Sequence, residues 1–514
     1  MAVKTFAAIS IGSAVTEMKV FEYSSRKTMK EIDWIGTRLN LGLDAYTTGR
    51  ISRKNVENLC DVLRDFKQIM NGYRITEYRA CATSAFRESR NMLILKDYIE
   101  KQTGFQIDVL SNSEQRFVDY QAIASVTEEF ETIIQNPAAI VDIGGNSMQI
   151  SLFDKDKLIT TQNIRIGSIT IREHLTPLEK NSSHFEQMVK EILDHELAGF
   201  NKLYQKDRQI KNLIVVGGNL VELLKPSEKS KKKINSISRA DFEHLSEAIR
   251  GKRPDEVAEM LDTPQEGCSE LAVSVLFCRI LMDNFGVDTV WLPGFHVSDG
   301  IAYEYGVKHK YIQNGHQFEE DIIAAARSIS KRYKCNQSHI KNLEGIALQF
   351  FDKMKKIHGM GARERLLLQI AVILHNCGKY ISLDDVSECA FNIIMATEII
   401  GLSHLEREMI AYTVKFNTSP FVYDAELTEK SDLTREEYLK IAKMTAILRI
   451  VNAMDRTHRQ KCKDVSVTLK DQELRVTVTS SEDLSLEIGA FREKAEFFEE
   501  VFQIHPEIRQ KKEF

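Results

Sequence analysis

The spacing of apolar residues predicts alternating strands and helices over residues 1–305. Apolar residues recur at helical spacing from Ile51 to Met70, and Tyr78 to Cys81 has the short apolar pattern of a strand. The same patterns predict strands that begin near Ala138, Met148, Leu158 and Leu213, and helices over 185–204 and 269–284. We therefore expect two α/β lobes, at residues 1–130 and 131–305.

The pattern changes after residue 305. From 306 to 464 it is helical throughout, and residues such as Leu343, Ala347 and Phe350 fall on one helical face. From Val465 onward apolar and polar residues alternate in two short runs, which predicts a pair of strands. We expect an all-α domain at 306–464 and a small β-rich domain at 465–514, closed by a helix around residues 491–501.

Two segments of the α/β region share one pattern: an apolar strand, a turn of small and polar residues, and a second strand. One runs from Ala139 to Phe153 and the other from Phe6 to Phe21. Glycines in such turns let backbone N–H groups approach an anion, and an acid beside them can hold a hydrated cation. Asp142 is that acid in one turn, whereas Ser10 occupies its place in the other. The repeat predicts two related halves that face a shared phosphate-binding cleft.

Composition narrows the class of protein. The chain has 514 residues, enough for about three or four domains. Its net charge of −5 argues against a general nucleic-acid binder. The sequence has no run of about twenty apolar residues, and its first residues lead straight into a strand. Its eight cysteines are scattered, with no Cys-x-x-Cys pair. We expect a cytoplasmic protein with reduced cysteines, no membrane span and no signal peptide.

Further short motifs, together with the two turns, carry a resemblance to a known family. In chain order they are Thr83-Ser84-Ala85-Phe86-Arg87, Leu110-Ser111-Asn112-Ser113-Glu114-Gln115, Arg165-Ile166-Gly167-Ser168, Val215-Val216-Gly217-Gly218 and Val297-Ser298-Asp299-Gly300. In these motifs the chain resembles the exopolyphosphatase and guanosine pentaphosphate phosphatase family (Ppx/GppA), within the actin, sugar-kinase and heat-shock ATPase superfamily. The resemblance implies a two-lobed actin-like fold, which is a duplicated ribonuclease H-like α/β unit, and a homodimer.

The resemblance also implies a binding site for phosphate groups. The phosphate-binding residues would be Arg87 and the turn residues Gly12, Ser13, Gly144, Gly145, Asn146, Ser147, Gly217 and Gly218. An arginine at position 87 can clamp two phosphate oxygens at once. The implied ligand is inorganic polyphosphate or a guanosine pentaphosphate, and the sequence leaves that choice open. The implied cofactor is Mg²⁺, or Mn²⁺, held weakly by Asp142.

The acids of this site are where the chain departs from the family pattern. Ser10 stands where the first turn usually has Asp, and Gln149 replaces a Glu beyond the second turn. Gln115 takes the place of the Glu that acts as general base; a glutamine can orient a water but cannot accept its proton. Glu114 is the neighbouring acid, but adjacent helical residues point about 100° apart. The candidate catalytic residues are therefore Gln115, Glu114 and Asp142.

These replacements predict that the chain retains ligand binding while its catalytic activity is weakened. Loss of a general base typically costs about 10² to 10⁴ in rate. We expect a protein that binds a phosphate-rich ligand and hydrolyses it weakly or not at all. Two alternatives stay open: a fully active exopolyphosphatase that releases terminal phosphate, and a regulatory or scaffold protein without catalysis.

The helical region contains a second candidate site. Residues 339–455 resemble an HD-type phosphohydrolase module, with His339, His375-Asn376 and Asp455 at the places of its metal ligands. Asn376 replaces an Asp with a neutral and poorer ligand. The favoured interpretation is a helical core that keeps an ancestral outline, and the alternative is a metal site.

A run of basic residues has two interpretations as well. It consists of Lys225, Lys229, Lys231, Lys232 and Lys233. Such a run can guide a polyanion toward its site, but it is more often a solvated loop, which is the interpretation we favour.

Overall fold

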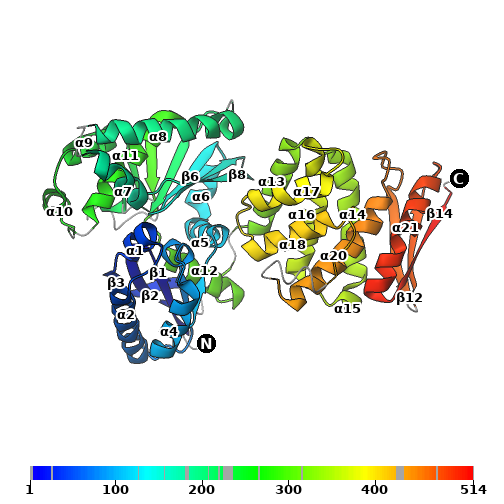
Figure 1. The fold of residues 1–514 in the computed structure, drawn as a ribbon, viewed down its shortest axis with the longest axis horizontal. Coiled ribbons are helices and arrows are strands. Elements are labelled where there is room, and N and C mark those ends of the chain that lie inside the picture. Colours follow the sequence, from blue (N-terminus) through cyan, green and yellow to red (C-terminus); the bar gives the residue numbers. More distant parts are fainter. Residues whose placement is uncertain are drawn as a thin grey trace. The chain divides into compact units, whose positions relative to one another are not determined.

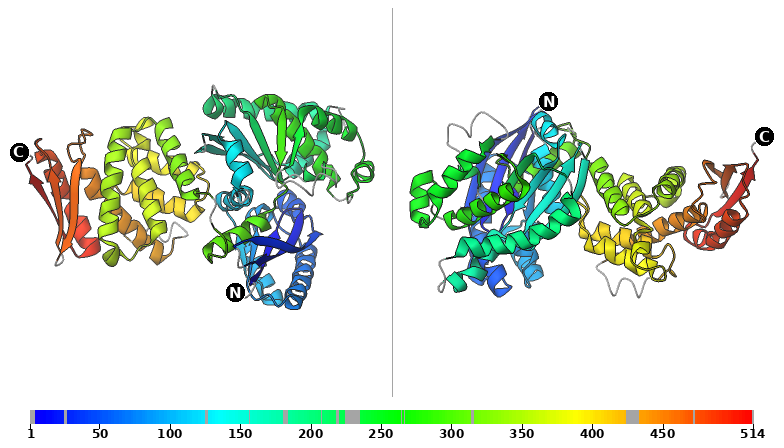
Figure 2. Two further views of the ribbon diagram at one scale, coloured as in Figure 1. Left: turned by 180° about the vertical axis from the view of Figure 1, so that it is seen from behind. Right: turned by 90° about the horizontal axis from the view of Figure 1, so that it is seen from above.

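The computed structural model describes residues 4–512, apart from 25–26, 125–126, 156, 180–183, 207, 218–219, 224–234, 264, 266, 314–315, 424–432 and 471–472. The chain divides into two compact units, Met1–Gln317 and Phe318–Phe514. Figure 1 and Figure 2 show both as ribbons. Across the described ranges, no helix is long and apolar enough to cross a membrane. The lysine run at 225–233 lies outside the described residues, so its two interpretations stay open.

The first lobe is built on a mixed sheet. Its described strands are β1 (Lys4–Ile11), β2 (Val15–Tyr23), β3 (Met29–Arg38), β4 (Tyr78–Ala82) and β5 (Ile107–Val109). They lie in the order β3-β2-β1-β4-β5; β2 is antiparallel to both β1 and β3, and β4 is parallel to both β1 and β5. The helices described in this lobe are α1 (Leu41–Thr48), α2 (Arg53–Gly72), α3 (Ser84–Arg87), α4 (Met92–Thr103), α5 (Asn112–Ala124) and α6 (Thr127–Ile134).

The second lobe repeats this topology. Its described strands are β6 (Ala138–Ile143), β7 (Met148–Asp154), β8 (Lys157–Ile164), β9 (Asn212–Gly217), β10 (Asn235–Ser238) and β11 (Thr289–Leu292). Read from β8, the strand order β8-β7-β6-β9-β11 has the same connections and the same strand directions as the first sheet. Strand β10 is added at the edge, antiparallel to β11. This repetition confirms the predicted duplicated α/β fold.

The helices that follow in unit 1 cover the second sheet and return to the first. They are α7 (Ser168–Glu179), α8 (Phe185–Phe200), the π-helical turn η1 (Asn201–Gln205), the short 3₁₀ segment η2 (Leu220–Leu223), α9 (Arg239–Ile249), α10 (Pro254–Leu261), α11 (Cys268–Phe285) and α12 (Val297–Lys308). The apolar core of the second lobe joins α7, α8, α9 and α11 to residues of β6 that include Val141 and Ile143. Because side chains alternate along a strand, Asp142 points to the opposite face of the sheet.

Helix α12 ties the end of unit 1 to its beginning. Phe6 of β1 stacks on Tyr305 of α12, with ring centroids 3.9 Å apart. The Tyr23 hydroxyl of β2 donates to the Ala302 carbonyl at 2.6 Å. On its other side α12 packs against α5, as Figure 1 shows. The crossing is so close that a Cβ at Gly300 would lie 2.0 Å from the carbonyl oxygen of Val118. The absence of a side chain at Gly300 therefore allows α5 to pack this close to α12.

Unit 2 is a helical domain followed by a small sheet. The described helices are α13 (Phe318–Arg332), α14 (Gln337–Lys353), α15 (Lys355–His358), α16 (Ala362–Leu374), η3 (Cys377–Tyr380), α17 (Val386–Ala396), α18 (His404–Lys415) and α20 (Arg435–Ala453). Strands β12 (Asp464–Lys470) and β13 (Glu473–Thr479) form the predicted antiparallel pair, and α21 (Ser485–Phe502) is the predicted closing helix. β14 (His505–Lys511) adds a third strand, parallel to β13. The predicted fold class is confirmed, whereas the division into four domains stays a prediction.

Candidate functional site

The first glycine turn joins β1 to β2. Gly12 donates its N–H to the Val15 carbonyl at 2.9 Å. A Cβ at Gly12 would lie 2.7 Å from that same oxygen, so any larger residue would force the turn to shift. The Ser13 carbonyl accepts a hydrogen bond from Gly42 N–H at 2.7 Å. The turn is thus fixed from both sides, as a preorganised anion site requires.

Three hydroxyl groups meet beside this turn. The Ser13 Oγ lies 2.6 Å from the Tyr46 Oη and 2.8 Å from the Ser84 Oγ, and the latter two atoms are 2.7 Å apart. Burial raises the pKa of Tyr46, although its hydrogen bonds to Ser13 and Ser84 oppose the shift. The phenol therefore stays protonated near neutral pH. The cluster offers hydroxyl donors that can reorient toward a phosphate oxygen.

The second glycine turn is anchored by the start of α7. The Gly144 carbonyl accepts from Ser168 N–H and the Gly145 carbonyl from Ile169 N–H, each at 3.0 Å. A Cβ at Gly167 would lie 2.3 Å from the Gly145 oxygen, so the approach of α7 depends on glycine there. The first N–H groups of α7 thus bind this turn rather than an external anion.

The two turns meet at Tyr46. A Cβ at Gly145 would lie 3.4 Å from the Tyr46 ring and 2.8 Å from the side chain of Ile169. The same tyrosine contacts Ser13 of the first turn through its hydroxyl. The structure therefore brings Ser13 of the first turn and Gly145 of the second next to the same side chain, Tyr46, which was not predicted as a site residue.

Asp142 lies at the end of β6, next to β9. Its strand neighbours are Gln149 on β7 and Val216 on β9. Gly217 follows Val216 with a φ of 75°, and a Cβ there would lie 3.2 Å from the Asp142 Oδ1 and 2.5 Å from the Ile143 oxygen. Glycine at 217 makes room for the carboxylate. The predicted phosphate contact Gly218 lies outside the described residues.

Helix α5 brings an arginine and a second acid to Asp142. The Arg116 side chain is buried, at 5% exposure, and its Nη2 donates to the Ser147 Oγ at 3.1 Å and to the Asn163 Oδ1 at 2.9 Å. Asp119, one turn further along α5, is also buried and is hydrogen-bonded to the side chain of Gln115. Neither Arg116 nor Asp119 was predicted as a site residue. The spacing of Asp119 from Gln115, four residues on one helix, was the available signal.

The two carboxylates influence each other. Burial and the negative charge of Asp142 raise the pKa of Asp119 well above its usual range, against the opposing effects of Arg116 and Gln115. Burial likewise raises the pKa of Asp142, while the positive charges of Arg116 and Arg87 oppose the rise. Asp142 therefore lies within the electrostatic reach of two arginines and one further acid.

The remaining predicted residues differ in their surroundings. Arg87, at the end of α3, donates from Nη1 to the Leu110 carbonyl at 2.6 Å. Glu114 begins α5 in a capping box: its carboxylate accepts from Ser111 N–H at 2.9 Å, and the Ser111 hydroxyl accepts from Glu114 N–H at 3.2 Å. This arrangement turns Glu114 toward the helix start, whereas Gln115 is bonded to Asp119. The catalytic roles of Gln115, Glu114 and Asp142 stay predictions.

Ser10 and Gln149, the other two positions where the resemblance implied an acid, are both buried. Ser10 is 5% exposed on β1 and pairs across the strands with Glu17 and Cys81. Gln149 is 3% exposed and pairs with Asp142. A neutral side chain at such positions avoids the cost of burying an uncompensated charge.

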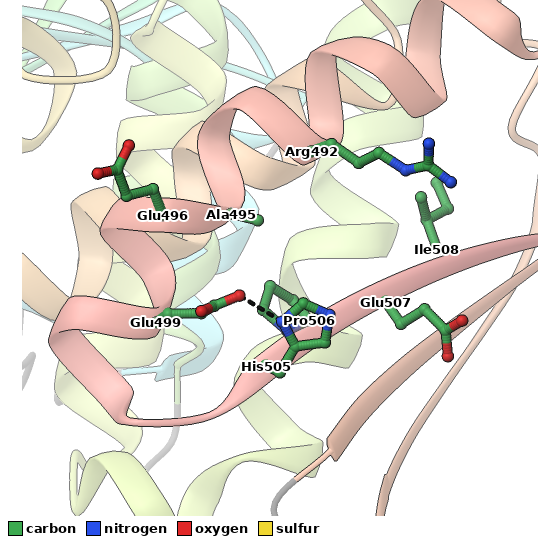
Figure 3. A pocket seen from close by; sticks show the side chains of 8 residues that line it. All are labelled: Arg492, Ala495, Glu496, Glu499, His505, Pro506, Glu507 and Ile508. Atoms are coloured by element: carbon green, nitrogen blue, oxygen red, sulfur yellow. Dashed lines mark hydrogen bonds and ion pairs between the residues drawn. The ribbon is translucent and has the colours of Figure 1, made fainter.

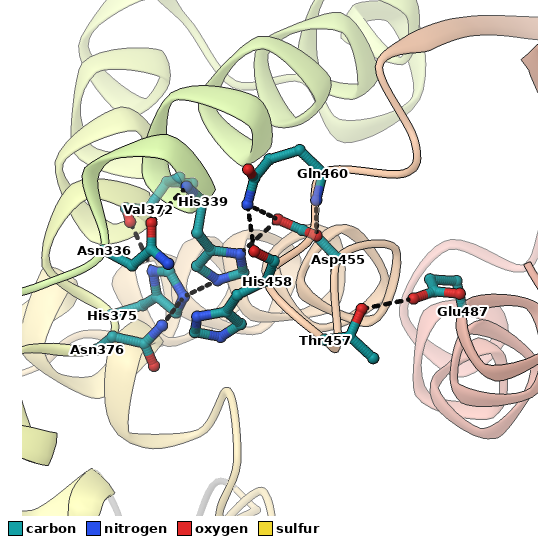
Figure 4. A network of polar contacts seen from close by, with 10 residues as sticks. All are labelled: Asn336, His339, Val372, His375, Asn376, Asp455, Thr457, His458, Gln460 and Glu487. Carbon is teal, nitrogen blue, oxygen red and sulfur yellow. Dashed lines mark hydrogen bonds and ion pairs between the residues drawn. The ribbon is translucent and has the colours of Figure 1, made fainter. Parts of the chain in front are cut away.

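The second candidate site, in unit 2, is a buried network of polar side chains (Figure 4). His339 Nδ1 lies 2.7 Å from the Asp455 Oδ2, and His339 Nε2 lies 3.2 Å from the Nε2 of His375. His375 donates from Nδ1 to the Val372 carbonyl at 2.6 Å, and Asn376 donates its amide N–H to His375 Nε2 at 2.8 Å. The structure thus brings together the three predicted residues His339, His375 and Asp455.

The surroundings of this network shift the pKa values of His375 and Asp455. Burial, and then the charge of His339, lower the pKa of His375 to about 3, so its ring is neutral at physiological pH. The pKa of Asp455 is lowered despite its burial, because His339 and Gln460 donate to the carboxylate. His458, which stacks on His339 with centroids 3.7 Å apart, was not predicted. Among the described residues, no group of three or more His, Cys, Asp and Glu is placed to hold a metal ion.

Metal content tests the interpretation of this network. Because the Asn376 amide already occupies the Nε2 lone pair of His375, we expect His375→Gln to leave the metal content of the full-length protein unchanged after incubation with Mn²⁺ or Zn²⁺. Asn376→Asp, which replaces the neutral amide by a charged carboxylate ligand, should raise the metal content. Elemental analysis after desalting measures both. A loss of bound metal in His375→Gln would show that the network is a metal centre.

A separate hollow of 340 Å³ lies in the C-terminal part of unit 2 (Figure 3). It is bounded by α21 and β14, and its polar lining includes Arg492, Glu496, Glu507 and an ion pair between His505 and Glu499. The hollow contains none of the residues predicted from the sequence. Its mixture of acids and bases does not favour one class of ligand.

Comparisons with known proteins extend over both units. A family model described as "Ppx/GppA phosphatase family" matches residues 20–308, and one described as "Ppx/GppA phosphatase, domain III" matches residues 323–489. A guanosine-5'-triphosphate,3'-diphosphate pyrophosphatase of Vibrio atlanticus is 20% identical over 484 residues, which cover 92% of this chain and 92% of that protein. A bifunctional 3-dehydroquinate synthase/phosphatase of Fusobacterium nucleatum is 26% identical over 178 residues; the match covers 32% of this chain and only 26% of that relative.

Solved structures show the same fold. The Aquifex aeolicus member of the Ppx/GppA family matches with a TM-score of 0.50 at 15% identity, covering 60% of this chain and 99% of that one. An exopolyphosphatase from Cytophaga hutchinsonii matches with a TM-score of 0.52 at 15% identity, covering 61% and 100%. Since the first family model spans more than half of the 514 residues, the chain belongs to the Ppx/GppA phosphatase family.

Proposed function

We propose that this chain binds a phosphate-rich anion, inorganic polyphosphate or guanosine pentaphosphate, and hydrolyses it weakly. Members of the family act on these ligands. The observation that carries the proposal is the meeting of two glycine turns at Tyr46, close to Arg87, Arg116 and the one retained acid, Asp142. Donors are abundant in this arrangement, whereas groups that can accept a proton are few.

The side chains present can bind a phosphate group and orient a water. Arg87 and the hydroxyls of Ser13 and Ser84 supply donors of the kind that hold phosphate oxygens. Gln115, fixed by its hydrogen bond to Asp119, can orient an attacking water but cannot take its proton. Weak turnover follows from that difference.

Members of the family use divalent metals, but the residues of this site fit such a metal poorly. Within the described ranges, no cluster of three or more potential His, Cys, Asp or Glu ligands occurs. The charged groups that oppose the pKa rise of Asp142 are the guanidinium groups of Arg116 and Arg87, which would repel a dication. We propose that Mg²⁺ or Mn²⁺ is held only weakly at Asp142. A homodimer and a cytoplasmic location, both expected from the sequence, remain proposals.

An arginine substitution tests binding separately from hydrolysis. Removal of a charge-assisted hydrogen bond typically costs about 1.5–3 kcal/mol, so Arg87→Ala should weaken the affinity for polyphosphate or guanosine pentaphosphate by about tenfold to a hundredfold. Isothermal titration calorimetry measures this, with Arg90→Ala as the matched control on an exposed arginine three residues away. Binding of neither ligand to the unmodified protein would refute the proposal and favour a scaffold role.

Measuring phosphate release from the same samples distinguishes the proposed weak hydrolysis from the alternative of a fully active exopolyphosphatase. The proposal predicts slow release at saturating ligand. A fully active exopolyphosphatase is favoured by the retained Asp142, and it would instead release phosphate rapidly and lose that activity in Asp142→Ala. Rapid release by the unmodified protein would replace the first proposal with this one.

A further inference from the structure

We propose that the buried guanidinium of Arg116 is a built-in cation for the bound phosphate ligand, so that ligand binding does not require a divalent metal. The inference rests on the proposed function and concerns the same site. It starts from a disagreement: the family uses divalent metals, whereas in this chain the guanidinium groups of Arg116 and Arg87 act on Asp142 beside the further acid Asp119.

The first observation is that Arg116 has unused hydrogen-bonding capacity. Its Nη2 is bonded to Ser147, the last residue of the second glycine turn, and to Asn163. Its Nε and Nη1 are buried and have no hydrogen-bond partner among the described residues. A buried guanidinium nitrogen without an acceptor is costly, and such groups usually have a water, an ion or a ligand as partner. An oxyanion is the acceptor that a guanidinium binds best.

The second observation is its position. The bond to Ser147 fixes the guanidinium at a turn whose glycines approach Tyr46. Its charge also acts on both Asp142 and Asp119. A phosphate group at the glycine turns would therefore lie near a fixed positive charge that costs no reorganisation when the ligand binds.

The third observation is the chemistry of the replaced residues. Ser10, Gln115 and Gln149 are neutral side chains at positions where the resemblance implies acids, and neutral side chains attract and hold a dication less well than carboxylates do. A buried arginine on α5 supplies positive charge in the same site. The loss of acids and the presence of Arg116 both shift the site from holding a metal to holding an anion directly.

The test measures polyphosphate binding by the full-length protein in EDTA and in Mg²⁺ at equal ionic strength. We expect the dissociation constant of the unmodified protein to differ by less than about threefold between the two conditions. Arg116→Met removes the charge at similar volume and should weaken binding in EDTA by at least about tenfold, with part of the loss restored by Mg²⁺. Asn163→Ala removes one partner of the guanidinium but keeps its charge, and it should bind nearly as the unmodified protein does.

The outcomes separate this inference from the function on which it rests. If the unmodified protein binds polyphosphate only when Mg²⁺ is present, the inference fails while the proposed function stands. If it binds in neither condition, both fail. Equal affinity of Arg116→Met and the unmodified protein in EDTA would also overturn the inference. Should Arg116→Met not fold, as judged by its thermal melt, the comparison of EDTA and Mg²⁺ on the unmodified protein decides alone.

Discussion

Replacing Gly300 by alanine is expected to destabilise unit 1 by about 3 kcal/mol and to weaken ligand binding, although alanine is the better helix former. The new Cβ would lie 2.0 Å from the Val118 carbonyl oxygen and 2.6 Å from its Cγ1. Backbone cannot yield as a flexible side chain can, so α5 and α12 must move apart. Overpacking of this kind costs about 1–3 kcal/mol and occasionally more. Because α5 carries Gln115, Arg116 and Asp119, the same movement disturbs the site.

The chain offers a matched control for this prediction. Gly199 lies inside α8, and apart from the helix's own backbone no described atom comes within 4 Å of the place that a Cβ there would take. Gly199→Ala should therefore stabilise the protein by about 0.5–1 kcal/mol. Both tryptophans, Trp34 and Trp291, lie in unit 1, so urea unfolding followed by tryptophan fluorescence reports on this unit. A Gly300→Ala midpoint equal to or above that of the unmodified protein would contradict the requirement for glycine at the α5–α12 contact.

The α/β architecture was predictable because its signals are local. Apolar alternation in β6 and β7 and helical spacing in α2 require only neighbouring residues. Strand β14 was not predicted, since its sequence His-Pro-Glu-Ile-Arg-Gln-Lys is mostly polar. It becomes a strand by pairing in parallel with β13 across an intervening helix. Pairing of this kind depends on tertiary contacts that no sequence window contains.

The residues of the candidate site likewise fall into those with a local sequence signal and those brought in by tertiary contacts. The glycine turns were found because Gly12, Gly144 and Gly145 are sequence signals for close backbone approach. Tyr46 was missed because its partners Ser13 and Ser84 are 33 and 38 residues away. Arg116 reaches Ser147, 31 residues further on, through a contact between lobes of the fold. The sequence thus identified the glycine turns, Arg87 and Asp142, whereas Tyr46, Arg116 and Asp119 required the structure.

Neutralising Glu17 is expected to have the second large effect on stability. Glu17, on β2, is 4% exposed, and its carboxylate accepts from Ser298 Oγ at 2.6 Å and Trp34 Nε1 at 2.9 Å. His296 Nδ1 lies 2.9 Å from it. Burial alone would raise the pKa of Glu17, but hydrogen bonds and the charge of His296 prevail and lower it to about 2. Because His296 and Ser298 stand at the start of α12, this carboxylate fastens α12 to the first sheet.

The lowered pKa of Glu17 determines how its contribution to stability changes with pH. The unfolded chain binds a proton at Glu17 near pH 4.5, whereas the folded chain resists it down to about pH 2. The stabilising contribution, about 3 kcal/mol by linkage, is therefore complete above pH 4.5 and declines as the pH falls toward 2. Glu17→Gln should lose about this amount at pH 7, and its difference from the unmodified protein should shrink on acidification through that window.

Urea midpoints at pH 7, 4.5 and 3 measure this difference, and Glu57→Gln is the control. Glu57 lies on the surface of α2 in an exposed pair with Arg53, and such pairs contribute about 0–1 kcal/mol. Its substitution should change the midpoint little at any of the three pH values. A Glu17→Gln difference that stays constant from pH 7 to 3 would show that the loss comes from altered packing rather than from the charge. A shrinking difference would instead identify the carboxylate as the group that fastens α12, against which α5 packs, to the first sheet.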